Sequence, residues 1–357
     1  MGLLSGPLFA QTPDPETYGA ESNPTGDPIG GGKGYSRIVS AADASIVVKT
    51  KKELLAALSA MGSGGIVYIS DGAKIDMTGE SEVQIPSGMT LASGRGRGRS
   101  KGALLYTSSA DARLVFLAGG PGIRITGLRL QGPDGGIGGK DPYTPPPVGG
   151  IKGAFAGLEI DNCELSRFPY AAVSLNPGAD GAYVHHSFIH HNQRGGLGYG
   201  IVVDQASVRV EANLFDTNRH AIAATGRPGT GYEASYNVFT GRKKNAAGYA
   251  HYALDMHAQA VNDRVIGGSV IRIHHNSIYY RGYNGDSAIG AVHIEGRPQK
   301  GAWIHHNVFA ADDDQAVSQR FYKRGPCDRG LCFVRDTFSD FDNVFVFSNK
   351  FGARPPR

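Results

Sequence analysis

The sequence predicts an all-β solenoid, a parallel β-helix in which successive turns of the chain stack on one another. One observation is a short motif that recurs between residues 158 and 310. Another is that each copy alternates apolar and polar residues, which is the periodicity of a β-strand. A third is the spacing of the copies, which is typical of stacked repeats. Because a single copy cannot bury its own apolar face, the copies must pack against one another as rungs.

The copies align on a small or amide side chain that is followed by a large apolar one. The aligned residues are Cys163, Ser187, Asn213, Asn237, Asn276 and Asn307. They are separated by steps of 24, 26, 24, 39 and 31 residues, so the longer steps indicate rungs with inserted loops. We expect the asparagines to form a ladder inside a turn, where each side-chain amide bonds to the rungs above and below.

Three of the copies carry a His-His pair directly before the aligned residue. The histidines of these pairs are His185, His186, His274, His275, His305 and His306. Side chains that recur at the same place on several rungs are typical of a scaffold. We therefore interpret these six histidines as structural.

Turn residues dominate the composition, since 52 of the 357 residues are glycine, and only one segment predicts a helix. In this segment Thr50 and Glu53 form a capping box, and Leu54, Leu55 and Leu58 make an apolar stripe. A solenoid needs a polar-faced lid over its open end. We expect a short N-terminal capping helix to be that lid.

The chain is expected to form one main domain with irregular ends. Residues 1–34 are predicted to be an N-terminal tail and extended arm, because the arm is rich in Pro, Gly, Asp and Asn. Residues 35–325 are predicted to be the parallel β-helix domain. Residues 326–357 are predicted to be a C-terminal loop, strand and tail that pack on the β-helix.

Several features bear on the compartment of the protein. No stretch is long enough and apolar enough to span a membrane. The apolar stretch within the first eleven residues fits either a clipped signal peptide or a plain tail. Cys327 and Cys332 could close a disulfide within a short loop, while Cys163 is expected to be a buried small hydrophobe. Together these features favour a secreted or periplasmic protein.

The net charge is mildly positive, at +4, and argues against a nucleic-acid-binding protein. Basic residues nevertheless cluster in two places. We interpret the first cluster, which comprises Arg95, Arg97, Arg99 and Lys101, as a solvated surface. The second cluster, at residues 242–244, fits a solvated loop and a contact to an acidic substrate equally well.

Each repeat core is followed by a second short strand, and alternation along these strands separates inner from outer side chains. The predicted interior residues are Ile201, Ile222, Leu254 and Val292, with Val203, Ala224, Met256 and Ile294 stacked beside them. The predicted outward columns are Val202, Ala223, Asp255 and His293, and beside them Asp204, Thr225, His257 and Glu295. Because parallel rungs lie about 4.8 Å apart, Asp255, His257, His293 and Glu295 should form a compact titratable cluster with Arg297 at its edge.

More polar residues flank this predicted cluster. Asn218, Arg219 and His220 lie on the rung below, and Tyr252 lies beside Asp255. The loop after Thr225 adds Arg227, Tyr232 and Glu233. Such a concentration of His, Arg, Asp and Tyr costs stability unless it has a use, and these residues break the repeat instead of following it. We therefore interpret this face as the candidate functional site.

Four segments carry a resemblance to a known group of proteins. They are the Gly-rich arm at 30–35, the helix at 50–60, the Ile-Pro-Ser-Gly-Met-Thr-Leu-Ala-Ser-Gly-Arg-Gly stretch and the His-His-Asn repeats. In these the chain resembles the right-handed parallel β-helix superfamily typified by pectate lyases and related uronan-modifying enzymes. The chain lacks an Arg-x-Pro-x-x-Arg segment, the dense Asp clusters of a Ca²⁺ site and an Asp-Pro-His-Asp signature, of which Asp255-Met-His257 is a partial echo.

The resemblance implies an enzyme that cleaves uronic acid polymers by β-elimination. This reaction needs a group that neutralises the C6 carboxylate, a base for the C5 proton and an acid for the O4 leaving group. On this interpretation Arg219 neutralises the carboxylate with help from Asn218, His220 or His257 is the base, Tyr232 or Tyr252 is the acid, and Asp255 orients His257. The predicted substrate-binding residues are Arg227, Lys243, Lys244, His293 and Arg297.

The resemblance also implies that a divalent metal such as Ca²⁺ could neutralise the carboxylate instead of Arg219. Apart from the resemblance, the spacing of Asp-x-His and His-x-Glu on neighbouring rungs makes four residues candidate ligands of a divalent ion of the Zn or Mn kind. They are Asp255, His257, His293 and Glu295. The expected partner is an acidic polysaccharide, with no nucleic acid and no membrane, and the expected state is a monomer.

Three alternatives keep the fold and change the function. A glycoside hydrolase needs two carboxylates, and Asp204, Asp255, Glu233 and Glu295 are candidates. A C5-epimerase would share the chemistry of a lyase without cutting the chain. A non-catalytic carbohydrate-binding solenoid would predict aromatic platforms, and the single Trp, Trp303, lies on a repeat core.

Overall fold

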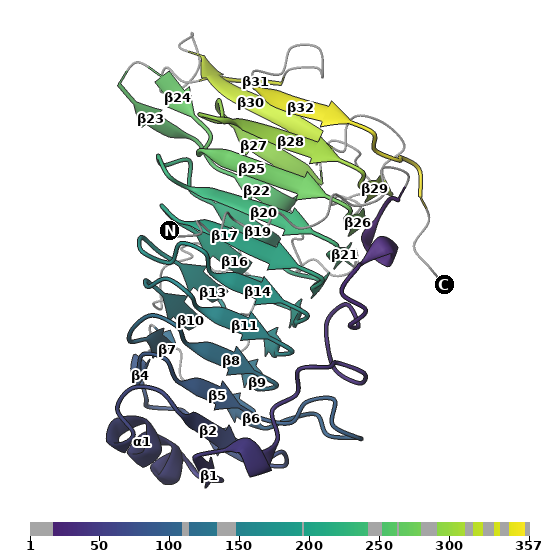
Figure 1. Ribbon diagram of the computed structural model, residues 1–357. Helices are drawn as coiled ribbons and strands as arrows, with labels where there is room; N and C mark the ends of the chain where they lie inside the picture. The colour runs from purple at the N-terminus through teal and green to yellow at the C-terminus, as the bar shows by residue number, and fades with distance from the viewer. Residues whose placement is uncertain are drawn as a thin grey trace, which may run out of the picture.

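The computed structural model describes residues 17–108, 114–133, 148–194, 196–241, 252–262, 264–279, 291–310, 317–323, 332–335 and 343–353. Over these residues the chain forms three long sheets that wind into a parallel β-helix (Figure 1). Each rung gives one strand to each sheet, so neighbours in a sheet come from successive rungs. The fold class predicted from the repeat is confirmed.

Sheet A is the eleven-stranded sheet that faces the viewer in Figure 1. In spatial order its strands are β1 (Ile46–Val48), β2 (Ile66–Ile69), β5 (Thr90–Ala92), β8 (Arg124–Thr126), β11 (Glu159–Asp161), β14 (Tyr183–His185), β17 (Ser207–Glu211), β20 (Gly231–Ser235), β25 (Val270–His274), β28 (Gly301–His305) and β32 (Val344–Phe347). Its strands are paired in parallel throughout the described residues.

Sheet B follows sheet A along each rung after a short turn. Its strands are β3 (Lys74–Asp76), β6 (Leu104–Tyr106), β9 (Arg129–Gln131), β12 (Glu164–Ser166), β15 (Phe188–His190), β18 (Leu214–Asp216), β21 (Val238–Thr240), β26 (Ser277–Ile278) and β29 (Val308–Phe309). The turn between sheets A and B is tight, and one residue of it has a positive φ on successive rungs, as at His186, His275 and His306. Histidine and asparagine tolerate this conformation better than most residues.

Sheet C is the third side of the solenoid. Its strands are β4 (Val83–Ile85), β7 (Leu114–Ala118), β10 (Gly149–Gly153), β13 (Ala171–Leu175), β16 (Tyr199–Val203), β19 (His220–Ala224), β22 (Tyr252–Met256), β27 (Val292–Glu295), β30 (Val317–Lys323) and β31 (Cys332–Arg335). The last pair, β30 with β31, is antiparallel, as is the separate hairpin of β23 (Gln259–Val261) and β24 (Arg264–Ile266).

The predicted asparagine ladder is present in the turn between sheets A and B. The Nδ2 atom of Asn213 donates to Oδ1 of Asn237 at 3.0 Å, and Asn237 donates in the same way to Asn276 at 3.0 Å. The ladder continues through Asn307 to Asn349, with distances of 2.9 and 3.0 Å. Buried amides need partners of this kind, so the ladder joins the rungs in a fixed register.

The core fills the interior between the three sheets, and all eight interior residues predicted for sheet C belong to it. Cys163 is fully buried there, as expected. The predicted lid is helix α1 (Lys51–Ala60), which begins at the Thr50–Glu53 capping box and buries Leu54 and Leu58. The described part of the chain contains no helix that could cross a membrane.

The N-terminal arm, residues 17–35, runs along the outside of the solenoid and includes the 3₁₀ turn η1 (Ala20–Ser22) (Figure 1, purple). A second 3₁₀ turn, η2 (Ala41–Asp43), precedes β1. The arm bonds to rungs far apart in the sequence, because Gly19 N donates to the carbonyl of His306 at 3.0 Å and Gly30 N to the carbonyl of Ala212 at 2.9 Å. It therefore ties the upper rungs to the lower ones. The cysteines at 327 and 332 and the disulfide expected between them lie outside the residues whose side chains are described.

Candidate functional site

The predicted cluster lies on the outer face of sheet C, on β19, β22 and β27. The parallel register pairs Ala223 with Asp255 and Asp255 with His293, as the alignment of the rungs predicted. The strand β22 has an irregularity at its start, where the backbone N–H groups of Ala253 and Leu254 both donate to the carbonyl of Ala291, at 3.1 and 3.0 Å. Both of these side chains are buried in the core, so Tyr252 and Asp255 lie on the outer face together.

Asp255 is the centre of the cluster and is in contact with three histidines. Its Oδ2 atom is 2.8 Å from Nε2 of His257 and 3.1 Å from Nδ1 of His220, and its Oδ1 atom is 2.8 Å from Nδ1 of His293. The carboxylate is almost fully buried. Burial alone would raise the pKa of Asp255, but the three imidazoles hold it well below its usual range.

His257 is the exposed member of the cluster, with 49% of its side chain accessible. The hydrogen bond to Asp255 raises the pKa of His257, although partial burial opposes this. Its Nε2 atom is engaged with Asp255, so Nδ1 is the ring nitrogen available to a ligand. A histidine held by a buried carboxylate in this way is well placed to take up and release a proton.

His220 and His293 lie deeper than His257, and both are only 2% exposed. Burial lowers the pKa of His220, although Asp255 opposes this effect. The ring of Tyr252 stacks on His293 with centroids 4.2 Å apart and planes 10° apart. Glu295 lies beside the cluster, with its Oε1 atom 3.9 Å from Nε2 of His293.

Arg219 is half-buried next to this cluster, as predicted. Its positive charge lowers the pKa of both His220 and His257, although burial and Asp255 act on these two groups more strongly. One guanidinium nitrogen donates to the carbonyl of Leu197 at 3.3 Å. The structure thus brings together the predicted residues Arg219, His220, Tyr252, Asp255, His257 and His293 on one face.

Aromatic side chains that the sequence analysis did not single out continue this face toward the N-terminal rungs. Tyr170 and Tyr199 meet edge to face with centroids 6.0 Å apart, and they pack with Leu197 and Ala223 in an apolar patch on the outside of sheet C. Tyr199 is paired in register with His220, and His220 with Tyr252. The same alignment of rungs that found Asp255 could have found this Tyr-His-Tyr column. Aromatic rings of this kind are surfaces on which sugar rings can pack.

Two of the predicted site residues have structural positions instead. Tyr232 lies on β20 of sheet A and points into the core, where it is 2% exposed, so it cannot reach a substrate outside the solenoid. Asn218 belongs to a second internal ladder, in which it accepts from Asn192 Nδ2 at 2.7 Å and donates to the carbonyl of Ile189 at 2.8 Å. The proposed roles of Tyr232 as acid and of Asn218 as carboxylate ligand are therefore wrong. The ladder could have been foreseen, since its step of 26 residues equals that from Ser187 to Asn213.

The other predicted substrate-binding residues lie at the edges of this region. Arg227 is exposed and forms an ion pair with Asp204 at 3.0 Å. Arg297 is exposed just beyond β27, where its backbone bonds to Val265 in the β23–β24 hairpin. Lys243 and Lys244 lie outside the described residues, so their role in substrate binding stays a prediction.

The carboxylates considered for a hydrolase do not form a free pair among the described residues. Asp204 accepts from Thr225 at 2.6 Å and from Arg227 at 3.0 Å. Glu233 lies on sheet A, where it contacts His274 at 3.4 Å. Asp255 is taken up by its three histidines, which leaves Glu295 without a second free carboxylate beside it.

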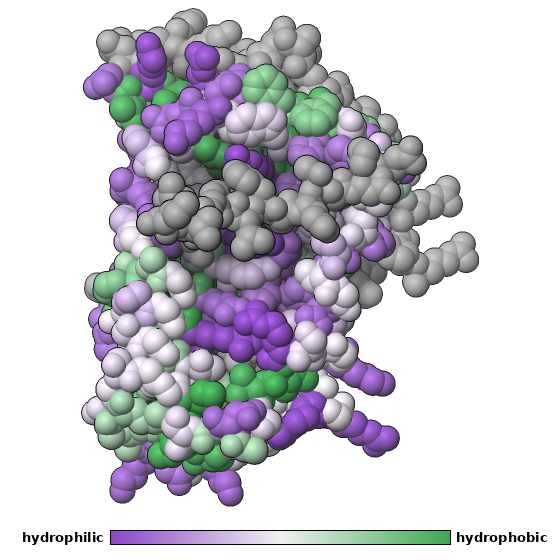
Figure 2. Space-filling view, viewed as in Figure 1, coloured by the Kyte–Doolittle hydropathy of each residue, from purple (hydrophilic) through white to green (hydrophobic). Residues whose placement is uncertain are grey.

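Within the described residues, one group offers three potential metal-ligand atoms within 4.8 Å of one another, and it lies on sheet A. It consists of Glu159, Asp161 and His185. Arg124 already binds Asp161 through Nε at 2.9 Å and Nη2 at 2.7 Å, and the hydroxyl of Tyr35 donates to Asp161 at 2.7 Å. A guanidinium at this position repels a second cation, so the group fits an ion-pair network that holds the arm better than a metal centre. Hydrophilic side chains gather at mid-height on this face (Figure 2).

Among the comparisons with known proteins, the likeness to an alginate lyase structure supports the fold. No family model and no curated protein matches the chain. The crystal structure of alginate lyase from Paenibacillus sp. str. FPU-7 is similar over 86% of this chain and 94% of that one, with a TM-score of 0.51 and 18% sequence identity. A structure of pectin methylesterase in complex with a hexasaccharide covers 89% of both chains, with a TM-score of 0.30 and 8% identity. At this level of identity the likeness to the alginate lyase concerns the fold.

Proposed function

We propose that the chain is a polysaccharide lyase that cleaves a uronic-acid-containing polymer by β-elimination on the outer face of sheet C. The observation that carries the proposal is the contact of one buried carboxylate, Asp255, with three histidines, of which only His257 is exposed. Such an arrangement serves proton transfer, and β-elimination is a reaction of two proton transfers. The fold shared with an alginate lyase is consistent with this class of substrate.

His257 is the base of the proposed reaction. Its Nδ1 atom takes the C5 proton, the electron pair forms the C4–C5 double bond, and the C4–O4 bond breaks with its electrons on O4. Asp255 fixes the orientation of the imidazole through Nε2 and stabilises the imidazolium that forms. The raised pKa of His257 supports this role, because a stronger base takes the carbon-bound proton more readily.

Arg219 and Tyr252 complete the proposed chemistry. Arg219 neutralises the sugar carboxylate, so that charge developing on the C6 carboxylate during proton removal is stabilised. Tyr252 remains as the acid that protonates O4, since Tyr232 is buried in the core. The Tyr170–Tyr199 patch supports a sugar ring on the neighbouring rungs.

A metal has no step in this proposal. Ca²⁺ takes six to eight oxygen ligands, and the cluster at Asp255 offers histidine nitrogens and two carboxylates, one of which is already fully engaged. The acidic group on sheet A is paired with Arg124. Neither set fits a calcium site, so the neutralising charge is assigned to Arg219 and the reaction is expected to continue in the presence of a chelator.

The test is a screen for the ultraviolet absorbance of the unsaturated product on a panel of uronans, each with and without chelator. We expect a signal on one polymer, unaffected by chelator, and a loss of about 10²–10⁴-fold in the variant His257→Gln. The matched control is His274→Gln, a histidine–carboxylate pair on sheet A, which should leave turnover unchanged. Absence of product absorbance on every acidic polymer would refute the lyase. A changed sugar ratio without cleavage would assign a C5-epimerase instead.

The proposal also places the protein outside the cytoplasm, in the medium or the periplasm, because a polymeric substrate does not enter the cell. Fractionation of the producing cells with an antibody against the chain tests this placement. Recovery of the protein in the cytoplasm alone would contradict it.

A further inference from the structure

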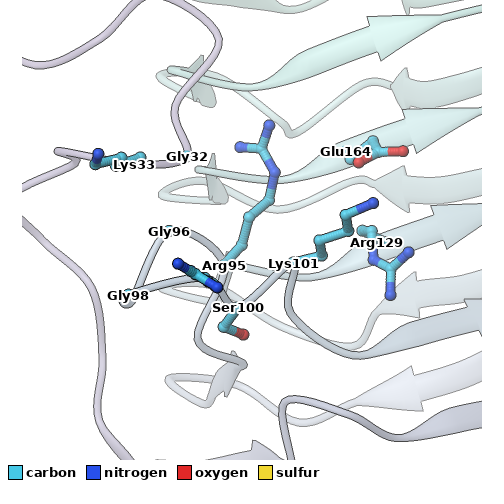
Figure 3. A pocket seen from close by; sticks show the side chains of 10 residues that line it. Gly32, Lys33, Arg95, Gly96, Gly98, Ser100, Lys101, Arg129 and Glu164 are labelled. Atoms are coloured by element: carbon cyan, nitrogen blue, oxygen red, sulfur yellow. The ribbon is translucent and has the colours of Figure 1, made fainter.

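A cavity of about 470 Å³ lies at the corner between sheets A and B, where the N-terminal arm crosses the turn 93–103. Its lining residues are Gly32, Lys33, Arg95, Gly96, Gly98, Arg99, Ser100, Lys101, Arg129 and Glu164. In Figure 3 Lys33 approaches from the arm on one side, Arg129 and Glu164 come from the strands on the other, and Arg95 and Lys101 stand between them. Sheet C is the third side of the solenoid, so this cavity is separate from the cluster at Asp255.

The cavity concentrates positive charge. Five of its lining residues are Lys or Arg and one is Glu, so its excess of positive charge equals the formal net charge of +4 of the whole chain. Among the described residues, none of the five cations lies within 4.0 Å of a carboxylate. Glu164 lies 3.5 Å from His190, and the charges of Arg95 and Arg129 also lower the pKa of Glu164. Three of the four basic residues interpreted above as a solvated surface, Arg95, Arg99 and Lys101, therefore line a concave site. Arg97 is exposed and pairs with Asp71 at 2.8 Å.

Two of the three arginines of the cavity, Arg95 and Arg129, are held in place by neutral oxygen atoms. Nη1 of Arg95 donates to the carbonyls of Gly30 and Asn162, at 3.0 and 3.3 Å, and to Oδ1 of Asn162 at 3.2 Å. Arg129 donates to the carbonyl of Gly102 through Nη2 at 3.1 Å. Carbonyl acceptors fix the geometry of a guanidinium without cancelling its charge. Burial lowers the pKa of Arg95, and the negative charge of Glu164 opposes this only in part.

Glycines bring the arm and the turn into contact so that the cavity can form. A Cβ atom on Gly96 would lie 2.0 Å from the carbonyl oxygen of Gly32, and one on Gly31 would lie 2.2 Å from that of His186. Both glycines also have a positive φ, of 88° and 67°. The close approach fixes Lys33 opposite the turn, so the site is built by two segments about 65 residues apart in the chain, as the bond from Arg95 to Gly30 shows.

We propose that this cavity binds the anionic group of an acidic glycan, a uronate carboxylate or a sulfate ester, as a second site remote from the catalytic face. Guanidinium groups bind such planar or tetrahedral oxyanions through two parallel hydrogen bonds. The volume falls in the range of sites for ligands of a few sugar rings. A nucleic acid would require an extended basic stripe along its backbone, whereas these charges surround one hollow. The choice of a glycan over other polyanions rests on the proposed function.

The test uses the full chain carrying Asp255→Asn, so that glycans are bound without being cleaved. Binding of sulfated dextran, oligogalacturonate and neutral dextran is measured by titration calorimetry, with single-stranded DNA as a further arm. Arg99→Glu with Lys101→Glu changes two exposed cations of the cavity. Lys49→Glu with Lys52→Glu is the matched control, because these two lysines are exposed near α1 and the change in net charge is the same.

We expect the acidic glycans to bind and the cavity pair to weaken that binding by about tenfold, while the control pair changes it by less than about twofold. The sulfated and carboxylated probes show which anion the site prefers. Equal losses in both pairs, or no loss in either, would overturn the inference. Selective loss of DNA binding in the cavity pair would assign the site to a nucleic acid. If the lyase screen is silent but the cavity pair still loses glycan binding, the cavity stands and the proposed function fails.

Discussion

Two buried aspartates on two outer faces of the solenoid show how the same residue serves a scaffold and a reaction. Asp161 on sheet A is bound by Arg124 through two nitrogens and by the hydroxyl groups of Tyr35 and Thr126. Among the described residues, the side chains that bind Asp255 on sheet C are imidazoles. A guanidinium keeps its proton at every accessible pH, whereas an imidazole exchanges its proton near neutrality. The first carboxylate therefore holds structure together, and the second is suited to move protons.

The histidines of the two faces differ in the same way. On sheet A and its turns they recur as pairs on three rungs, and two of these pairs stack on one another, as in His274 on His305 at 5.2 Å and His275 on His306 at 5.0 Å. On sheet C, His220, His257 and His293 follow no repeat and converge on one carboxylate. Histidines that repeat on several rungs therefore indicate a scaffold, whereas histidines that converge on one carboxylate indicate a functional site.

The largest effect is expected from Asp255→Asn, which should lower turnover by about 10²–10⁴-fold because His257 loses its orienting carboxylate. The melting temperature should change less than in the corresponding change at Asp161. The measurement is the initial rate on the polymer identified by the lyase screen, together with a thermal melt. Full activity in Asp255→Asn would remove the distinction between the two faces.

The next effect is on stability. Asp161→Ala leaves the guanidinium of Arg124, a side chain that is 19% exposed, without its principal partner. Breaking a buried pair of this kind costs about 3–5 kcal/mol. We expect the free energy of unfolding to fall by about this amount. Urea denaturation measures the free energy of unfolding. The catalytic rate per folded molecule should be unchanged. A loss of activity without a loss of stability would reverse the roles of the two aspartates.

A smaller effect should be a pH dependence of stability that arises from histidines on sheet A and its turns. Burial lowers the pKa of His186, His275 and His305 to about 4, and neighbouring histidines add to the effect. In the unfolded chain these groups bind protons at their usual pKa of 6.5, so the unfolded state binds more protons than the folded state between pH 6.5 and 4. Stability is therefore lost as the pH falls through this interval. Calorimetry should show a melting temperature lower by several degrees, about 5 °C, at pH 5 than at pH 7.

The control for this pH dependence is His275→Gln, which should flatten it without affecting turnover. A melting temperature that is constant from pH 7 to pH 5 in the unaltered chain would contradict the lowered pKa values of these histidines.

The smallest effect is expected at the edge of the site. Tyr199→Leu removes one ring of the Tyr170–Tyr199 patch while keeping the apolar contact with Leu197. We expect KM to rise by about three- to tenfold with little change in kcat, because the ring stabilises the bound sugar and takes no part in proton transfer. Steady-state kinetics separates the two constants. A fall in kcat alone would place Tyr199 among the reacting groups.

The sequence predicted the repeat, the asparagine ladder, the inner and outer columns of sheet C and the meeting of Asp255, His257 and His293. These features follow from two regular periods, the two-residue alternation of a strand and the register of stacked rungs. Tyr232 was misplaced because its strand on sheet A was interpreted as a loop. The capping helix was predictable for a local reason, the Thr50–Glu53 capping box.

The remaining features depend on where the arm docks, and spacing cannot supply this. Tyr35 reaches Asp161 and the arm glycines reach Arg95 across more than 60 residues of chain. With these contacts in place, Arg95, Arg99 and Lys101 form part of the wall of a cavity and not a plain surface. A repeat pattern describes how rungs meet their neighbours, and it contains no information on a segment that crosses several rungs from outside.

The path of the arm has a consequence for biosynthesis. Ala20 donates to the hydroxyl of Ser277, a residue that follows it by 257 positions. At a ribosomal rate of about 5–20 residues per second, the arm waits about 10–50 s for this partner to be made. The rungs need only near neighbours in order to stack, so we expect the arm to dock onto rungs that have already assembled. Docking of the arm thus requires that the rungs carrying the candidate active site have been made and stacked in order.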